Sequence, residues 1–356
     1  KKIRPTESKK FLRNPHKGIA TCRKYDGDPP AASKWILPGM QGPTEEMLRP
    51  PLHYLPSSVA YFRWYWVAFQ PEEDRFDWSR VDAALEGAAQ HDQTLQIRLM
   101  PHGLGWKGEK SENDVLPDWY LRKYPVADAV RYGHPYTIPI YDSPEYIDKW
   151  TQAILEFGRR YDGHPALESV DIAFLGAWGE GGGNATEKTI DTITDAYRQA
   201  HPKTPLVTMI GSHKMTAGIR AGAGWRCDCF GDLRQWHNVD VPEGVGENWN
   251  HMYDRYPMAR CECGARDAWK TRPVVCETCA TPMAGHTSQF DLEFIIQQGL
   301  KYHGTIFMPH GAALLPTTAQ ITLQSLPAPA LDATVAVAVI FSAITIALAF
   351  SAVPLL

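Results

Sequence analysis

The sequence predicts an α/β fold, namely a (β/α)8 TIM barrel with long βα loops. Short runs rich in apolar and β-branched residues alternate with helical stretches from about residue 18 to residue 309. This alternation is typical of parallel strands joined by crossover helices. Eight such runs occur, which is the number of strands that a closed barrel needs. One barrel takes roughly 250 residues, so the 356 residues of the chain suffice.

The predicted strands are short and spread over most of the chain. They comprise residues 18–22, 59–66, 95–101, 169–175, 206–211, 227–232, 273–277 and 304–309. We expect the barrel to occupy residues 1–316, followed by an apolar tail, 317–356, to which the pattern assigns no structure. Residues 333–356 of the tail carry no charge and are a candidate for membrane contact.

The helix predicted at 143–161 has the clearest signals. Ser143 is suited to cap it and Pro144 to its first turn. Its apolar residues share one face, namely Ile147, Trp150, Ile154 and Phe157. Further helices are predicted at 81–91, 186–200 and 291–303.

Two long insertions interrupt the alternation, at 26–56 and 102–142. Both are rich in Pro, Gly and aromatic residues, and they follow the first and third predicted strands. Loops at the carboxyl ends of barrel strands form the active-site face of this fold. We therefore expect both insertions to shape a cleft.

Composition favours a small-molecule substrate over a nucleic acid. The formal net charge of −4 provides no broad basic surface for phosphates, so no nucleic-acid partner is expected. The 12 Trp and 15 Tyr exceed the usual needs of a core, and aromatic rings suit the apolar faces of sugars. Trp64, Trp66, Trp106 and Trp249 are candidate stacking platforms, with core packing as the alternative for each.

Two glutamates at strand ends are suited to glycoside hydrolysis. Glycosidic bonds are cleaved by two carboxyl groups, one of which protonates the leaving oxygen while the other attacks the anomeric carbon or activates water. Glu180 follows the fourth predicted strand, after Trp178 and Gly179, and Glu277 ends the seventh. Strands four and seven of a barrel end on opposite sides of one cavity. The two glutamates thus form a candidate catalytic pair, whereas a surface or helix-capping role is the alternative for each alone.

Other segments carry recognisable motifs. Residues 70–78 are like the "EPxEGxYDW" block of galactosidase-type barrels, and further matches lie at 14–21, 60–66, 98–103, 178–180, 249–252, 267–270 and 273–279. Over about residues 11–310 the chain resembles the clan of retaining glycosidases with a (β/α)8 barrel, in particular bacterial barrel proteins of the β-galactosidase type. The resemblance implies that Glu180 is the acid/base and Glu277 the nucleophile.

The chain also departs from that clan. Gly179 stands where the clan has an Asn that holds the sugar 2-hydroxyl beside the acid/base. Residues 307–311 replace a segment with polar Asn and Lys, and the accessory β domain of the resembled family does not follow. The contact with the sugar 2-hydroxyl is therefore expected from another residue or is missing.

An arginine is expected to support the nucleophile. Charge-assisted hydrogen bonds from a guanidinium stabilise an ionised carboxylate. Arg63 is the first candidate and Arg98 the second, since both lie near strand ends. The alternative is an arginine paired inside the barrel with Asp171 or Asp232.

The remaining candidates for substrate binding are polar or aromatic residues near predicted strand ends. They are His102, Trp178, Trp249, Asn250 and His251. For each of them, structural hydrogen bonding or packing is the alternative.

The cysteines provide a different hypothesis. The pairs at 227/229, 261/263 and 276/279 are candidates for a zinc site or a local disulfide. Two pairs are CxC, and two cysteines fall within predicted strands, so independent thiols are favoured and no metal ligand is assigned. Because phosphate loops, dinucleotide fingerprints and HExxH runs are missing, no cofactor is expected. The odd number of seven Cys leaves the compartment open, with a secreted or periplasmic location slightly favoured.

Taken together, these patterns predict a hydrolase that cleaves β-linked sugars of an oligo- or polysaccharide by retaining double displacement. Glu277 is the predicted nucleophile and Glu180 the predicted acid/base. The alternatives are a carbohydrate-binding barrel without turnover and a barrel stabilised by a Cys-bound metal. The separation of the carboxyl groups distinguishes mechanisms, because about 5 Å indicates retention and roughly 6.5–9.5 Å inversion.

Overall fold

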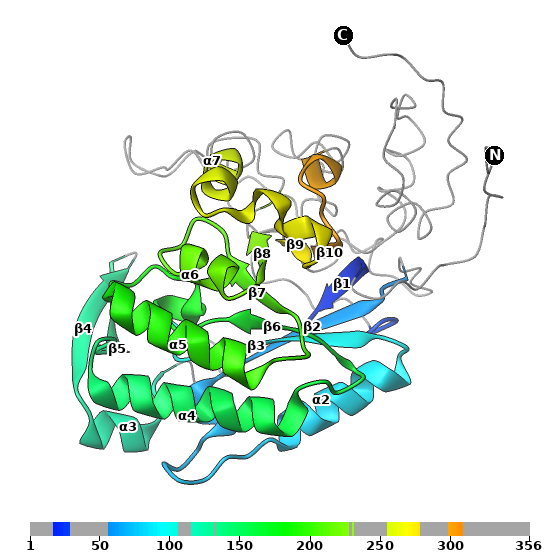
Figure 1. Ribbon diagram of the computed structural model, residues 1–356. Coiled ribbons are helices and arrows are strands. Elements are labelled where there is room, and N and C mark those ends of the chain that lie inside the picture. Colours follow the sequence, from blue (N-terminus) through cyan, green and yellow to red (C-terminus); the bar gives the residue numbers. More distant parts are fainter. Residues whose placement is uncertain are drawn as a thin grey trace, which may run out of the picture. The chain divides into compact units, whose positions relative to one another are not determined.

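Eight strands form a closed barrel, which confirms the predicted fold class (Figure 1). The computed structural model describes residues 17–28, 56–105, 115–131, 133–227, 230, 255–277 and 298–308. Around the barrel the strand order is β1-β10-β9-β8-β7-β6-β3-β2, and the strand pairs β3–β6, β6–β7 and β7–β8 are parallel. Counted along the chain, β6 is therefore the fourth barrel strand and β9 the seventh.

The barrel strands largely match the predicted runs. Their bounds are Gly18–Cys22 for β1, Val59–Tyr65 for β2, Thr94–Met100 for β3, Leu167–Ile172 for β6, Leu206–Met209 for β7, Gly224–Cys227 for β8, Val274–Glu277 for β9 and Ile306–Met308 for β10. The prediction is wrong for the sixth strand, which ends at Cys227 instead of beginning there. β8 contains Gly224 and the buried Arg226, which local patterns do not read as a strand.

Helices follow most of the strands. They are α1 Trp66–Phe69, α2 Ser79–Gln90, α3 Asp118–Lys123, α4 Pro144–Tyr161, α5 Glu187–Ala200, α6 Met215–Arg220 and α7 Arg255–Glu262, with 3-10 turns η1 Ala177–Gly179 and η2 Ala265–Lys270. The predicted cap of α4 is confirmed, since Ser143 Oγ accepts a hydrogen bond from Tyr146 N at 3.1 Å. Of the helix predicted at 291–303, residues 298–301 are helical, and residues 291–297 lie outside the described residues.

The insertion at 102–142 contains a hairpin and a helix that the sequence patterns do not predict. Strand β4, Val126–Arg131, pairs antiparallel with β5, His134–Pro139. The register runs from Val126 opposite Pro139 to Arg131 opposite His134. In Figure 1 this two-stranded ladder stands apart from the barrel strands. The other insertion, at 26–56, lies almost entirely outside the described residues.

Strand β3 shows how the barrel separates apolar from polar side chains. Successive residues of a strand point to opposite faces. Leu95, Ile97 and Leu99 share one face, and β3 packs against helix α2. Gln96 and Arg98 share the other face, and both are fully buried. Since Arg98 is paired with Asp171 of β6, this polar face is the inner one.

An aromatic cluster fills the space between the barrel and helices α3 and α4. Trp66 is fully buried at its centre and contacts the rings of Trp119, Tyr120, Tyr146 and Trp150. Its indole nitrogen donates to Gln70 Oε1 at 2.6 Å. Trp66 is therefore a core residue, which excludes the predicted stacking role. Trp64 is half-buried in β2, and Trp106 and Trp249 lie outside the described residues.

The chain divides into two compact units. One comprises Ala60–Cys227 and Arg255–Val274, and the other Lys1–Val59, Asp228–Asp254 and Val275–Leu356. The predicted tail, 317–356, lies outside the described residues. Among the helices that the structure describes, none has the length and apolarity needed to cross a membrane.

Helices α4 and α5 meet at a glycine, which makes Gly158→Ala a test of the packing. A Cβ at Gly158 would collide with the backbone carbonyl of Ala200. Alanine normally favours a helix over glycine by about 1 kcal/mol, but overpacking costs about 1–3 kcal/mol. We expect Gly158→Ala to lower the free energy of unfolding in urea titrations. Gln152→Ala, on the exposed face of α4, is the control and should leave it nearly unchanged. Equal stability of the two variants would contradict this packing.

Candidate active site

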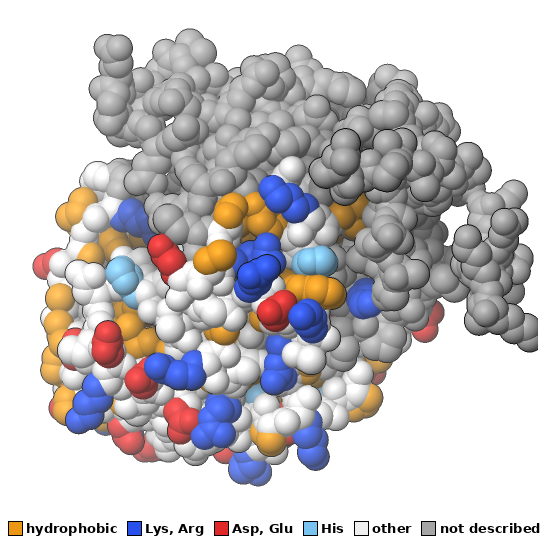
Figure 2. All heavy atoms as spheres, turned by 45° about the horizontal axis from the view of Figure 1, so that its top comes forward, with side chains coloured by type: hydrophobic (Ala, Val, Ile, Leu, Met, Phe, Trp, Pro, Cys, Tyr) orange, Lys and Arg blue, Asp and Glu red, His pale blue; other side chains and the backbone are white. Residues whose placement is uncertain are grey.

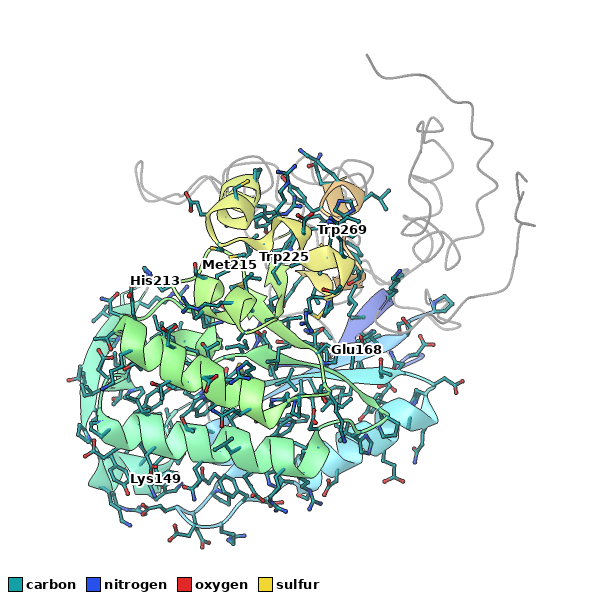
Figure 3. All side chains as sticks on the ribbon, in the orientation of Figure 1. Lys149, Glu168, His213, Met215, Trp225 and Trp269 are labelled. Carbon is teal, nitrogen blue, oxygen red and sulfur yellow. The ribbon has the colours of Figure 1, made fainter. Side chains whose placement is uncertain are left out.

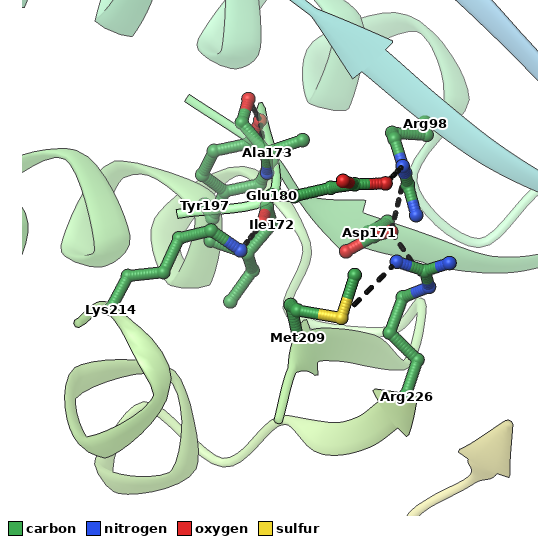
Figure 4. A network of polar contacts seen from close by, with 9 residues as sticks. All are labelled: Arg98, Asp171, Ile172, Ala173, Glu180, Tyr197, Met209, Lys214 and Arg226. Carbon is green, nitrogen blue, oxygen red and sulfur yellow. Dashed lines mark hydrogen bonds and ion pairs between the residues drawn. The ribbon is translucent and has the colours of Figure 1, made fainter. Parts of the chain in front are cut away.

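A buried charge network lies on the inner face of the barrel (Figure 4). Asp171 of β6 accepts from Arg98 Nε of β3 at 2.7 Å, and Arg226 Nε of β8 lies 3.3 Å from the same carboxylate oxygen. Arg98 Nη1 also binds Glu180 Oε1 at 3.0 Å. The side chains of Arg98, Arg226 and Asp171 are at most 2% exposed, whereas that of Glu180 is 22% exposed. Glu180 is therefore the member of this network that reaches solvent.

Burial and charge act in opposite directions on this network. Burial disfavours the charge of Arg98, but Tyr61, Asp171 and Glu180 outweigh it and hold the pKa of Arg98 above its ordinary value. Lys214, also fully buried, lies in the loop after β7. Burial lowers the pKa of Lys214 to about 8, against the attraction of Asp171. Arg98 thus stays charged, whereas Lys214 loses its proton more easily.

Side chains from three elements bind the carbonyl groups at the end of β6 and just beyond it. Lys214 Nζ donates to Ile172 O at 2.6 Å, and the hydroxyl of Tyr197 of α5 donates to Ala173 O at 3.0 Å. Tyr146 of α4 donates its hydroxyl proton to Phe174 O. Buried carbonyls beyond the end of a strand need such partners. Together these donors fix the direction in which the chain leaves the barrel toward Glu180.

The loop that presents Glu180 has an unusual backbone. Gly176, Gly179 and Gly181 have φ values of 77°, 71° and 99°, and Trp178 has a φ of 57°. Left-handed φ values are easily reached by glycine and are strained for a tryptophan. Gly181 N donates to Leu175 O at 2.6 Å, and Leu175 bridges to Glu180. The glycines therefore allow a tight loop with Glu180 next to the strand end.

Gly179 occupies a position where no side chain fits. A Cβ there would lie 2.5 Å from Ala173 Cβ and 2.9 Å from the Ala173 carbonyl carbon. The Asn that the resembled clan carries before its acid/base is therefore incompatible with this loop. This explains the departure from the clan that the sequence shows at Gly179.

His102 is fully buried and links the segment after β3 to the loop that presents Glu180. Its Nδ1 lies 2.8 Å from Gly103 O and its Nε2 2.8 Å from the hydroxyl of Tyr141. A carbonyl only accepts, so we assign the proton to Nδ1. Tyr141 accepts from Gly176 N at 3.0 Å, and the His102 carbonyl accepts from Trp178 N at 2.8 Å. Because protein groups engage both ring nitrogens, His102 is suited to positioning the loop and has no ring nitrogen left for the predicted sugar contact.

Trp178 and the inserted hairpin meet beside Glu180. The guanidinium carbon of Arg131, the last residue of β4, lies 5.2 Å from the centroid of the Trp178 ring. On the next strand, Tyr136 contacts the ring of His102 at 5.9 Å between centroids. The hairpin therefore contacts Trp178 in the loop of Glu180 and His102 in the segment after β3. Arg131 could not be recognised from the sequence, because its partner Trp178 lies in the loop after another strand.

The other predicted site residues are only partly described. Arg63 is half-buried in β2. Glu277 is the last residue of β9 and is 8% exposed, and its backbone oxygen accepts from Phe230 N at 2.8 Å. Trp249, Asn250 and His251 lie outside the described residues. Arg98, the second candidate for supporting the nucleophile, binds Glu180, the predicted acid/base. It also pairs with Asp171, which is the alternative that the sequence left open.

Comparisons with known proteins find solved structures with a similar fold. No protein-family model and no curated protein matches the sequence. Among solved structures, the catalytic domain of β-amylase from Paenibacillus polymyxa is 8% identical, with a TM-score of 0.50 over 76% of this chain and 92% of that one. This chain is similar in fold to that catalytic domain.

Two further structures overlap less well with this chain. Xylanase 10B from Thermotoga maritima has 10% identity and a TM-score of 0.41, covering 83% of each chain. Endo-glycoceramidase II from Rhodococcus sp. has 14% identity and a TM-score of 0.44, covering 84% of this chain and 75% of that one. At such low identities the likeness concerns the fold alone.

The cysteine pairs do not assemble a metal site within the described ranges. Cys261 is exposed and Cys263 half-buried at the end of α7, and both are free thiols. Cys227 and Cys276 are buried within β8 and β9. No three His, Cys, Asp or Glu side chains converge as metal ligands in the part of the chain that the structure describes. Cys229 and Cys279 lie outside it.

Glu73 is a charged group outside the network that has structural partners. It lies after α1 and binds Lys123, Tyr124 and, at 3.1 Å, Lys149 of α4, and these contacts lower its pKa to about 2. Figure 3 labels Lys149. Figure 3 also shows His213 and Met215 where the chain enters α6. On the described surface in Figure 2, basic and acidic side chains are interspersed. Such a mixed surface differs from the broad basic face that binds nucleic acids.

The buried His102 predicts a loss of stability in acid. Burial lowers the pKa of His102 to about 4, whereas an unfolded histidine titrates near about 6.5. Between these values the unfolded chain binds a proton that the folded chain does not, so stability falls as the pH falls. The expected loss is roughly 3 kcal/mol. Urea titrations from pH 7 to pH 4 should show this loss in the intact protein and less of it in His102→Gln. The same acid dependence in both proteins would show that His102 is not the cause.

Because Gly179 is crowded, alanine substitutions at Gly179 and at the nearby Gly182 should differ in their effect on stability. Gly179→Ala forces a left-handed φ on a residue with a Cβ and pushes that Cβ against Ala173, so a loss of about 1–3 kcal/mol is expected. At Gly182 a Cβ would meet nothing within 4 Å and φ is not positive, so Gly182→Ala is the matched control. Thermal unfolding of the two variants measures the difference. A neutral Gly179→Ala would mean that the loop has another backbone.

Proposed function

We propose that the chain is a glycoside hydrolase that cleaves β-linked sugars, with Glu180 and Glu277 as its carboxyl groups. The observation that carries the proposal is the setting of Glu180. It follows the fourth barrel strand, is partly exposed, and is held by an arginine that is itself fully buried. Catalytic groups of barrel enzymes lie at the carboxyl ends of the strands. The likeness in fold to a β-amylase catalytic domain supports a carbohydrate substrate.

The proposed reaction is a retaining double displacement. The carboxylate of Glu277, at the end of the seventh barrel strand, attacks the anomeric carbon, while Glu180 protonates the leaving oxygen. Glu180 then removes a proton from the water that hydrolyses the glycosyl-enzyme. The substrate is an oligo- or polysaccharide with a β-linked sugar, in keeping with the resemblance to β-galactosidase-type barrels.

Arg98 positions Glu180 at the strand end. A guanidinium binds a carboxylate by charge-assisted hydrogen bonds of defined direction. The contact of Arg98 Nη1 with Glu180 Oε1 at 3.0 Å therefore orients this carboxyl group. Arg98 is itself held in place by its bond with Asp171 at 2.7 Å.

Removal of either carboxyl group tests the proposal. Glu180→Gln and Glu277→Gln should each lower kcat/KM for chromogenic β-glycosides, by roughly 10²–10⁴-fold or more for the acid/base. Glu86→Gln, an exposed glutamate of α2, is the matched control and should keep full activity. Circular dichroism and thermal unfolding confirm that the variants fold. Full activity of either active-site variant would exclude the assignment.

The roles of the two glutamates can be separated with azide. In Glu180→Gln the glycosyl-enzyme still forms, so azide should release a glycosyl azide with the configuration of the substrate. In Glu277→Ala azide attacks the substrate directly, so the product should have the opposite configuration. Exchange of the two outcomes would reverse the roles. If the intact protein binds oligosaccharides but cleaves none, the chain is a carbohydrate-binding barrel.

A further inference from the structure

The polar inner face of the barrel continues beyond the charge network. Gln96 lies two residues before Arg98 on β3, and Ser169 lies two residues before Asp171 on β6. Gln96 and Ser169 are register partners on these adjacent strands, as are Arg98 and Asp171. Both pairs therefore point to the same side of the sheet, one step apart. All of these side chains are buried.

Several polar atoms in this region have no hydrogen-bond partner among the described residues. They are Nη2 of Arg98, Oε1 and Nε2 of Gln96, Oγ of Ser169 and the hydroxyl of Tyr61. Tyr61, on β2, belongs to the same cluster, because the guanidinium carbon of Arg98 lies 5.7 Å from the centroid of its ring. Buried polar groups without partners are costly and usually mark a bound water or ion.

The chemistry of these atoms favours an anion over water. The Arg98 and Gln96 nitrogens only donate, and the two hydroxyl groups rotate to donate. Gln96 Oε1 is the one acceptor-only atom in this set, so donor hydrogens are in excess. A water molecule would accept from two of these donors and bring two more donors, whereas a halide ion only accepts. The positive charge of Arg98 adds electrostatic attraction for a monovalent anion.

We propose that the barrel interior binds a small monovalent anion of the chloride type, held by Arg98, Gln96, Ser169 and Tyr61. Arg98 is shared between this site and Glu180, since its Nη1 binds Glu180 while its Nη2 faces the anion. A bound anion fixes the arginine that positions Glu180. Binding of the anion can be measured on the resting protein, so its test does not depend on glycosidase activity.

Thermal unfolding in different salts tests the anion site. The full chain is dialysed into sodium gluconate and titrated with sodium chloride or bromide at constant ionic strength. We expect a saturable rise of the unfolding midpoint of about 2–4 °C at halide concentrations well above the dissociation constant. Ser169→Ala should weaken the response and Gln96→Leu should abolish it. In crystals grown with bromide, anomalous scattering should place the ion beside Arg98.

A matched variant separates site binding from a general salt effect. Thr194 of α5 has a buried hydroxyl that also lacks a partner in the described residues, but it lies on a helix outside the strands. Thr194→Val should keep the halide response of the intact protein. A midpoint that does not depend on halide would overturn the proposal, as would an equal, non-saturating response in all variants. If the intact protein binds halide but cleaves no glycoside, the proposed function is contradicted and the anion site is still supported.

Discussion

Asp171 is the constraint on which the rest of the barrel interior depends. Its carboxylate lies between two buried guanidinium groups from β3 and β8. Barrel interiors are usually filled by bulky branched side chains, and a buried charge is tolerated only when it is paired. Removal of this one carboxylate would leave two arginines without their shared counter-ion. The same contact holds Arg98 at the distance from which it reaches Glu180, so the charged core and the candidate site form one network.

Much of the fold could be predicted from the sequence, because its signals are local. Alternating and continuous apolar runs located most strands, and Ser143 with Pro144 located the start of α4. β8 was misplaced for a physical reason. Arg226 looks like a solvent-exposed residue until Asp171, distant in the sequence, is brought next to it. For Trp66 the sequence left stacking and core packing open, and the packing of α3 and α4 around it decides for the core.

The position of Glu180 next to a strand end could be predicted from the sequence, whereas most of the side chains that hold its loop could not. Glu180 follows a buried strand and a Trp, a pattern visible in the chain itself. The donors that hold the chain after β6 come from α4, α5 and the loop after β7, as Tyr146, Tyr197 and Lys214. A tyrosine on the buried face of a helix is a weak signal for such a role. The clearest sequence signal was a departure, since Gly179 in place of Asn reflects a loop that leaves no room for a side chain.

The β4–β5 hairpin is separable from the barrel ladder. Its strands pair with each other, from Val126 opposite Pro139 to Arg131 opposite His134, while β3 continues the barrel by pairing with β6. Exchange of the hairpin for another segment would thus leave the barrel ladder intact and remove the contact of Arg131 with the Trp178 ring. The segment that contacts Trp178 can therefore change in sequence without disturbing the charged interior, whose ion pairs join β3, β6 and β8.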